Sequence, residues 1–235
     1  MKFLLTNLML CFALFATAQT NDPNAKARAL SGSFSKVSVS TGIELYLTQA
    51  NENAVSVSVS DNRYEEGLKT EIVDGTLKIY YEAKGKSFKV KNLKLKAYVT
   101  YKNLDGISCS AGSNTSLTNT LNAENLNLTV SSGSSFEGNI KVSNVTATTH
   151  SGAEAIVSGK VEKLNVTSHS GSSFKGANLV SSYCTASAHS GGSIKIEVQK
   201  ELTASAHSGG EIRYTGSGSV IKTDLHSGGS VKKVK

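Results

Sequence analysis

Tryptophan is absent from the chain, proline occurs once, and aromatic residues make up only 6% of the 235 residues. Globular α/β enzymes seldom have such a composition. Serine, threonine, glycine and asparagine are abundant instead. This balance is typical of a protein built from many short strands joined by polar turns.

Long hydrophobic runs are also missing, apart from one at the N-terminus. Lys2 precedes the apolar residues 3–15, and Ala16, Thr17 and Ala18 provide the small residues of a cleavage site. The run is too short to span a bilayer, and no other stretch approaches a transmembrane segment. We therefore predict a signal peptide at residues 1–18 and a short segment at 19–28. Export would place the protein in the periplasm, on the outer surface or outside the cell.

Negative charge is in deficit, because 25 lysine and arginine residues face 18 aspartate and glutamate residues. The resulting formal charge of +7 favours acidic partners. Aromatic residues do not alternate with the basic ones, as platforms for nucleic acid require, so we expect no nucleic-acid partner.

Glycine, in contrast, recurs at regular intervals. A Ser-Gly or Ala-Gly pair returns every 18 to 21 residues, with its glycine at Gly112, Gly133, Gly152, Gly171, Gly191, Gly209 and Gly228. The last five copies read His-Ser-Gly and contain every histidine of the chain: His150, His169, His189, His207 and His226. Such a period predicts a stacked repeat architecture.

Residues on either side of each glycine alternate with period two, as strands do. The inward column after the glycine is expected to contain Phe136, Ala155, Phe174, Ile194, Ile212 and Val231. Stacked copies bury such a column as a continuous core. The glycine forms a corner, and the serine before it is expected to point inward. We predict an all-β fold in which residues 108–235 form a right-handed β-helix, or β-solenoid, with rungs of about 19 residues.

Residues 29–107 contain short alternating strands with a less regular spacing, and Asp74-Gly75 is a hairpin turn signal. No hinge rich in proline or glycine separates them from the repeats. We expect this irregular β-rich part to form one continuous domain with the solenoid. Cys109 and Cys184 fall about four rungs apart, beyond the reach of a disulfide, and are expected to be small buried hydrophobic residues.

Three segments carry a family resemblance: residues 34–49, residues 74–79 and residues 104–112, together with the Ser-Gly repeats. They resemble the "putative auto-transporter adhesin, head GIN domain" family over roughly residues 30–235. The resemblance implies an exported β-helical domain of a Gram-negative bacterium. It transfers no catalytic residues, because the shared motifs are structural.

Two outward columns are candidate sites. A basic column after the corner contains Lys175, Lys195, Arg213 and Lys232. It is a candidate for binding an acidic polysaccharide or another envelope component; the alternative is a solvated edge that prevents pairing with neighbouring molecules. In the histidine column, His207, Asp224 and His226 form the one candidate metal site. Zinc requires three or four convergent ligands, so we favour a purely structural stack and expect no cofactor.

Catalysis would require clustered carboxylates. Glu154 and Glu211 share a column but lie three rungs apart, too far for a paired acid and base. We therefore expect a non-enzymatic, adhesin-like binding domain of the cell envelope. The alternatives are a β-helix carbohydrate-active enzyme (a polysaccharide lyase or hydrolase) and a purely structural envelope protein. The sequence leaves the oligomeric state open.

Overall fold

The computed structural model describes residues 22–83 and 93–235. The predicted signal peptide at residues 1–18 lies outside the described residues. The strands before the repeats are β1 (Lys26–Arg28), β2 (Lys36–Val39), β3 (Glu44–Gln49), β4 (Ala54–Val59), β5 (Leu68–Val73), β6 (Thr76–Tyr81) and β7 (Leu95–Tyr101). One 3-10 helix, η1 (Asn62–Gly67), joins β4 to β5.

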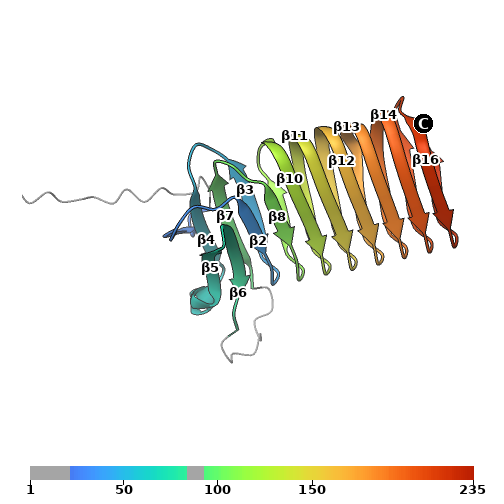
Figure 1. Ribbon diagram of the computed structural model, residues 1–235. Coiled ribbons are helices and arrows are strands. Elements are labelled where there is room, and N and C mark those ends of the chain that lie inside the picture. The colour runs from blue at the N-terminus through green and yellow to red at the C-terminus, as the bar shows by residue number, and fades with distance from the viewer. Residues whose placement is uncertain (1–21, 84–92) are drawn as a thin grey trace, which may run out of the picture.

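The repeats contain ten further strands. They are β8 (Gly106–Cys109), β9 (Asn114–Leu117), β10 (Leu121–Ser131), β11 (Ser135–His150), β12 (Glu154–His169), β13 (Ser173–His189), β14 (Ser193–His207), β15 (Glu211–Thr215), β16 (Ser219–His226) and β17 (Ser230–Lys233). They stack side by side into a β-solenoid of about 7 turns, with the tight turns aligned along one edge (Figure 1). The predicted all-β solenoid is thus confirmed.

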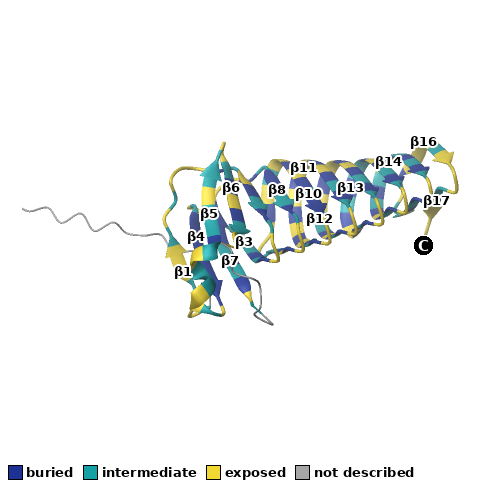
Figure 2. Ribbon diagram, turned by 90° about the horizontal axis from the view of Figure 1, so that it is seen from below, coloured by how far each residue is buried: buried dark blue, intermediate teal, exposed yellow. Residues whose placement is uncertain are grey.

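Neighbouring rungs pair in parallel, one repeat apart. His150 lies beside His169, His169 beside His189, and the pairing continues to His207 and His226. The column that was predicted to face inward, from Phe136 to Ile212, is also in register and at most 1% exposed. The alternation of dark and light segments along the strands reflects this pattern (Figure 2). The small Ala155 between Phe136 and Phe174 leaves room for both aromatic rings, as interdigitated packing requires.

Stacking in the same register begins before residue 108. The strand β2 pairs with β8 and β3 pairs with β9, so β2 and β3 form a rung around the turn at Thr41-Gly42. Residues 50–105 are inserted between this rung and the next. The insertion contributes β6 and β7, which pair with the outer edges of β2 and β3. Asp74-Gly75 forms the expected turn, between the antiparallel strands β5 and β6.

The tight turns differ from the prediction in one respect. The serine that follows each histidine was expected to point inward, but Ser151, Ser170, Ser190, Ser208 and Ser227 are all exposed. Both turn residues have positive φ, 48–55° for these serines and 68–77° for the glycines that follow them. Two successive left-handed residues reverse the chain as in a type I′ turn, and their side chains then face the solvent.

Successive turns are hydrogen-bonded to each other along the axis of the solenoid. The N–H of each turn glycine, from Gly42 to Gly209, donates to the carbonyl oxygen of the residue before the glycine in the next turn, at 3.0–3.2 Å. Backbone N–H and C=O groups of each turn therefore find hydrogen-bond partners in the neighbouring turns. These bonds fix the register of the columns on both sides of the turn.

Candidate functional site

The basic column lies on the strand that follows each tight turn. Lys175 pairs with Lys195, Lys195 with Arg213 and Arg213 with Lys232, and all four side chains are exposed. They point outward because the preceding residues, Phe174, Ile194 and Ile212, are buried in the core. Val231, the last residue predicted for that inward column, is only partly buried. Since adjacent rungs lie about 4.8 Å apart, the column is a straight row of cations along the axis.

Two of these cations are already paired with carboxylates. Lys175 forms a salt bridge with Glu154, and Arg213 Nε lies 2.9 Å from Glu211 Oε1. Within the described part of the chain, Lys195 and Lys232 have no carboxylate within salt-bridge distance. These two lysines therefore carry the uncompensated positive charge of the column.

The histidines lie in the single column that the repeat register predicts, and the rings of three of the four neighbouring pairs are stacked. The ring centroids lie 5.2 Å apart for His150 and His169, 5.1 Å for His189 and His207, and 4.9 Å for His207 and His226. The turn serine contacts the ring in two rungs, with Ser151 Oγ 3.2 Å from His150 Nδ1 and Ser170 Oγ 3.2 Å from His169 Nδ1. The column thus combines ring stacking with a local contact to the exposed turn.

Asp224 contacts both histidines of the predicted metal site. Its Oδ1 lies 2.9 Å from His226 Nε2, and its Oδ2 lies 3.7 Å from His207 Nε2. Ser205 Oγ lies 2.7 Å from the same Nε2 atom of His207. The three predicted residues are therefore brought together, but as a carboxylate between two imidazoles. Among the described residues, no group of three His, Cys, Asp or Glu side chains is arranged to hold a metal ion.

Glu154 and Glu211, the two carboxylates considered for catalysis, lie three rungs apart, as the repeat register predicts. Glu154 is followed in its column by Ser173, Ser193 and then Glu211, three rungs away. Each glutamate binds a cation of the basic column instead. This column therefore contains no acid and base at the separation that glycoside hydrolysis requires.

The side of the solenoid away from the tight turns contains a depression that the sequence analysis missed. Asn122, Lys141 and Lys160 follow one another in register along it, and Glu162 also lines it. Gln49 holds Asn122 in place, because its Oε1 accepts from the Asn122 backbone N–H at 2.8 Å. The spacing of 19 residues between Asn122, Lys141 and Lys160 was a visible signal in the sequence. This depression combines one amide side chain with charged side chains of both signs.

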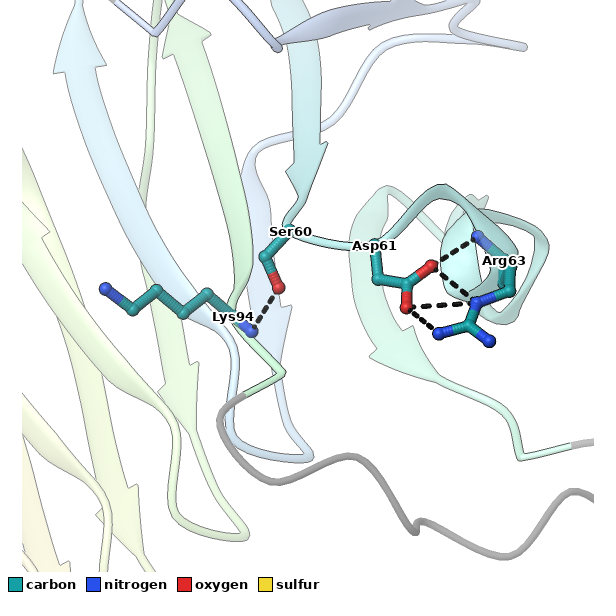
Figure 3. Close-up of polar contacts among 4 residues, drawn as sticks. All are labelled: Ser60, Asp61, Arg63 and Lys94. Carbon is teal, nitrogen blue, oxygen red and sulfur yellow. Dashed lines mark hydrogen bonds and ion pairs between the residues drawn. The ribbon is translucent and has the colours of Figure 1, made fainter.

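A second shallow polar depression lies in the N-terminal part, lined by Asp22, Ser60, Lys94 and Tyr98 among others. Its polar groups are largely engaged with each other. Tyr98 donates to Asp22 Oδ2 at 2.9 Å, and the backbone N–H of Lys94 donates to Ser60 Oγ at 3.0 Å. Figure 3 shows this second contact, with the Lys94 ammonium extending away from it.

The adjacent carboxylate of Asp61 does not contribute to this depression. It accepts from the backbone N–H of Arg63 at 3.0 Å and pairs with the Arg63 guanidinium, with Nη2 2.6 Å from Oδ2 (Figure 3). The hydrogen bonds from the Arg63 side chain and backbone hold the pKa of Asp61 below its usual value. Asp61 therefore caps η1, so its role is local and structural.

The fold and these surfaces define a class of protein: a β-solenoid with flat polar faces, closed at its N-terminal end by an inserted antiparallel segment. The chain belongs to the family described as "Putative auto-transporter adhesin, head GIN domain", whose model matches residues 33–218. The resemblance read from the sequence is thereby confirmed.

Solved structures of similar fold come from Bacteroides and Parabacteroides. A "putative adhesin" from Bacteroides fragilis is 18% identical, covers 89% of this chain and 93% of its own, and superposes with a TM-score of 0.75. A "putative lipid binding protein" from Parabacteroides distasonis is 19% identical, with coverages of 91% and 98% and a TM-score of 0.66. A "putative adhesin" from Parabacteroides merdae is 17% identical, with coverages of 94% and 100% and a TM-score of 0.66. At these identities the likeness establishes the fold.

No curated protein matches the chain. Within residues 22–83 and 93–235, no helix has the length and apolar character needed to cross a membrane.

Proposed function

We propose that the protein is an exported, non-enzymatic, adhesin-like binding domain of the bacterial cell envelope, and that its basic column binds an acidic polysaccharide. The observation that carries the proposal is the register of Lys175, Lys195, Arg213 and Lys232, four exposed cations in one straight row. A polyanion laid along the axis meets each of them in turn, and a rigid row requires little reorganisation on binding.

Membership of the adhesin family and the names of the similar solved structures support a binding role and export. The enzyme alternative is less well supported, because Glu154 and Glu211 are three rungs apart and each is paired with a cation. A purely structural envelope protein remains the competing proposal, and the binding experiment separates the two.

The experiment measures binding of the protein to alginate, an acidic polysaccharide, with neutral dextran as the reference. Replacing the four cations of the column by glutamine is expected to reduce alginate affinity at least about tenfold, with little change in melting temperature, since the side chains are exposed. Binding by the unmodified protein is expected to weaken as salt increases. Dextran is expected not to bind.

A matched control removes four charges elsewhere, by glutamine at Lys69, Lys78, Lys94 and Lys163. Its affinity is expected to stay close to that of the unmodified protein. An equal loss in both variants would show that only net charge matters and would refute the column as the site. Absence of alginate binding by the unmodified protein would favour the structural alternative.

The paired glutamates provide a test in the opposite direction. Replacing Glu154 and Glu211 by glutamine frees Lys175 and Arg213 from their salt bridges. If the column is the binding site, this double variant is expected to bind alginate more tightly than the unmodified protein.

A further inference from the structure

The last rung of the solenoid has an open edge. On one side β16 pairs with β14, and β17 pairs with β15. Among the described residues, no strand pairs with the other side of either. An exposed strand edge presents unpaired N–H and C=O groups, which form a template for another strand.

Apolar side chains concentrate on this same rung. Of the five large hydrophobic residues that are exposed in the described part of the chain, four belong to it: Val220, Ile221, Leu225 and Val234. Val220 and Leu225 continue inward columns, because they pair with Leu202 and Ala206. These two partners are fully buried, whereas Val220 is 37% and Leu225 is 46% exposed. The core columns therefore end uncovered, and the last rung is the most exposed part of the solenoid in Figure 2.

The charges of β16 are arranged symmetrically about its centre. Lys222 and Asp224 flank Thr223. They pair with Thr203 and Ser205 of β14, which alternate with the buried residues of that strand, so both charged side chains point outward. If two copies of β16 pair antiparallel about Thr223, Lys222 of each copy lies directly opposite Asp224 of the other. Opposite charges in directly opposing positions stabilise an antiparallel pair, and the arrangement occurs twice.

We propose that β16 is a self-association edge, through which two copies of the chain join end to end by antiparallel pairing. A two-fold contact of this kind uses the same surface on both copies, so it closes as a dimer. Head-to-tail stacking, which would build a fibre, is blocked at the N-terminal rung, because β6 and β7 already occupy the outer edges of β2 and β3. Antiparallel, end-to-end pairing instead joins the two copies through identical edges.

The dimer is expected to be weak. The contact is one strand long, and Lys232 and Lys233 on β17 bring like charges of the two copies near each other. Sedimentation equilibrium of the full chain over a range of concentrations is therefore the appropriate measurement. The expected result is a reversible monomer–dimer equilibrium.

Charge reversal at the two central residues tests the geometry. The single variants Asp224→Lys and Lys222→Asp place like charges opposite each other, and each is expected to raise the dissociation constant at least about tenfold. The double variant Lys222→Asp/Asp224→Lys restores opposite charges and is expected to dimerise as the unmodified protein does. Lys78→Asp, on an exposed position of β6, is the control for a lysine-to-aspartate change and is expected to have no effect.

Asp224 also contacts His207 and His226, so its replacement removes those interactions. The double variant lacks them too, and its recovery therefore reports the opposing charges alone. Melting temperatures establish that each variant is folded. An unmodified protein that stays monomeric at all concentrations, or a double variant as weak as the single ones, would overturn the proposal.

Discussion

A side chain in this solenoid acts mainly through the column it shares with its equivalents in the rungs on either side. Ile194 packs between Phe174 and Ile212 and is completely buried. Its neighbour Lys195 has the same strand environment but points into solvent. One step along the chain therefore separates a buried position that tolerates no charge from an exposed position that does.

Ile194→Asp tests this difference at the residue scale. The carboxylate would be buried among apolar side chains with no cation to pair with, so we expect a loss of more than about 4 kcal/mol in the free energy of unfolding. Lys195→Asp is the matched control and is expected to change stability by less than about 1 kcal/mol. Urea denaturation measures both, and similar losses would show that the assignment of inside and outside is wrong.

Cys109 and Cys184, the two cysteines among the described residues, provide a second residue-scale prediction. Both are free and buried, as expected from their spacing, and burial raises the pKa of Cys109 and of Cys184 to about 12. In the unfolded chain a thiol ionises near ~8.5. Between these values the unfolded state loses protons that the folded state keeps, so stability is fully present below about pH 8.5 and falls as the pH rises toward 12.

The measurement is the urea midpoint at pH 8 and at pH 10, with a Cys109→Ala/Cys184→Ala variant for comparison. The variant is expected to lose less stability over this interval. The native thiols are also expected to resist Ellman's reagent until the protein unfolds, because the thiolate is the reactive form. Rapid reaction at neutral pH would contradict the burial of both residues.

At the scale of the element, the tight turn is the unit that determines the register. Gly191 has φ of 74° and open space around the position of a Cβ atom, whereas a Cβ on Gly192 would lie 2.1 Å from the carbonyl oxygen of Ser168. The first glycine is therefore needed for its backbone conformation. The second is needed because the preceding rung lies too close.

Alanine at each position is expected to separate these two causes. Gly191→Ala imposes only the strain of a left-handed alanine, and we expect a loss of about 1 kcal/mol. Gly192→Ala must displace backbone in the neighbouring rung, so a loss of more than about 2 kcal/mol is expected. Thermal or urea unfolding gives both values, and the reverse order would contradict the packing of the turn against the rung before it.

The element scale also shows what could be predicted from the sequence. The columns of Phe136, His150 and Lys175 followed from counting, because a regular period converts sequence distance directly into register. The orientation of Ser151 did not, because the inward–outward alternation of a strand does not extend through a turn with two left-handed residues. The rung at Thr41-Gly42 was also missed, since an insertion at residues 50–105 hides its relation to the next turn.

For the candidate site, the sequence predicted the positions but not the charge balance. The four cations of the basic column lie where the period places them, yet the salt bridges from Glu154 and Glu211 depend on side-chain contacts within and between rungs. The same holds for Asp224. Its position beside His207 and His226 follows from the period, whereas the contacts of its carboxylate with both imidazoles could be seen only in the structure.

At the scale of the whole molecule, the two ends of the solenoid differ. The N-terminal rung is covered by β6 and β7, whereas the C-terminal rung exposes apolar side chains and a free strand edge. Because each rung contacts only its neighbours, stability is approximately a sum over rungs and the interfaces between them. The last rung has one interface instead of two, so we expect it to open before the others.

The hydrogen bonds between successive turns have a mechanical consequence for such a molecule. They run along the axis, so a pull on the C-terminal end loads the rungs one after another and peels them away, and the last rung is the first to yield. Each released rung adds about 19 residues of slack, roughly 60 Å of extended chain. The molecule would therefore lengthen in nearly equal steps under load, and the rung that β6 and β7 cover would give way last.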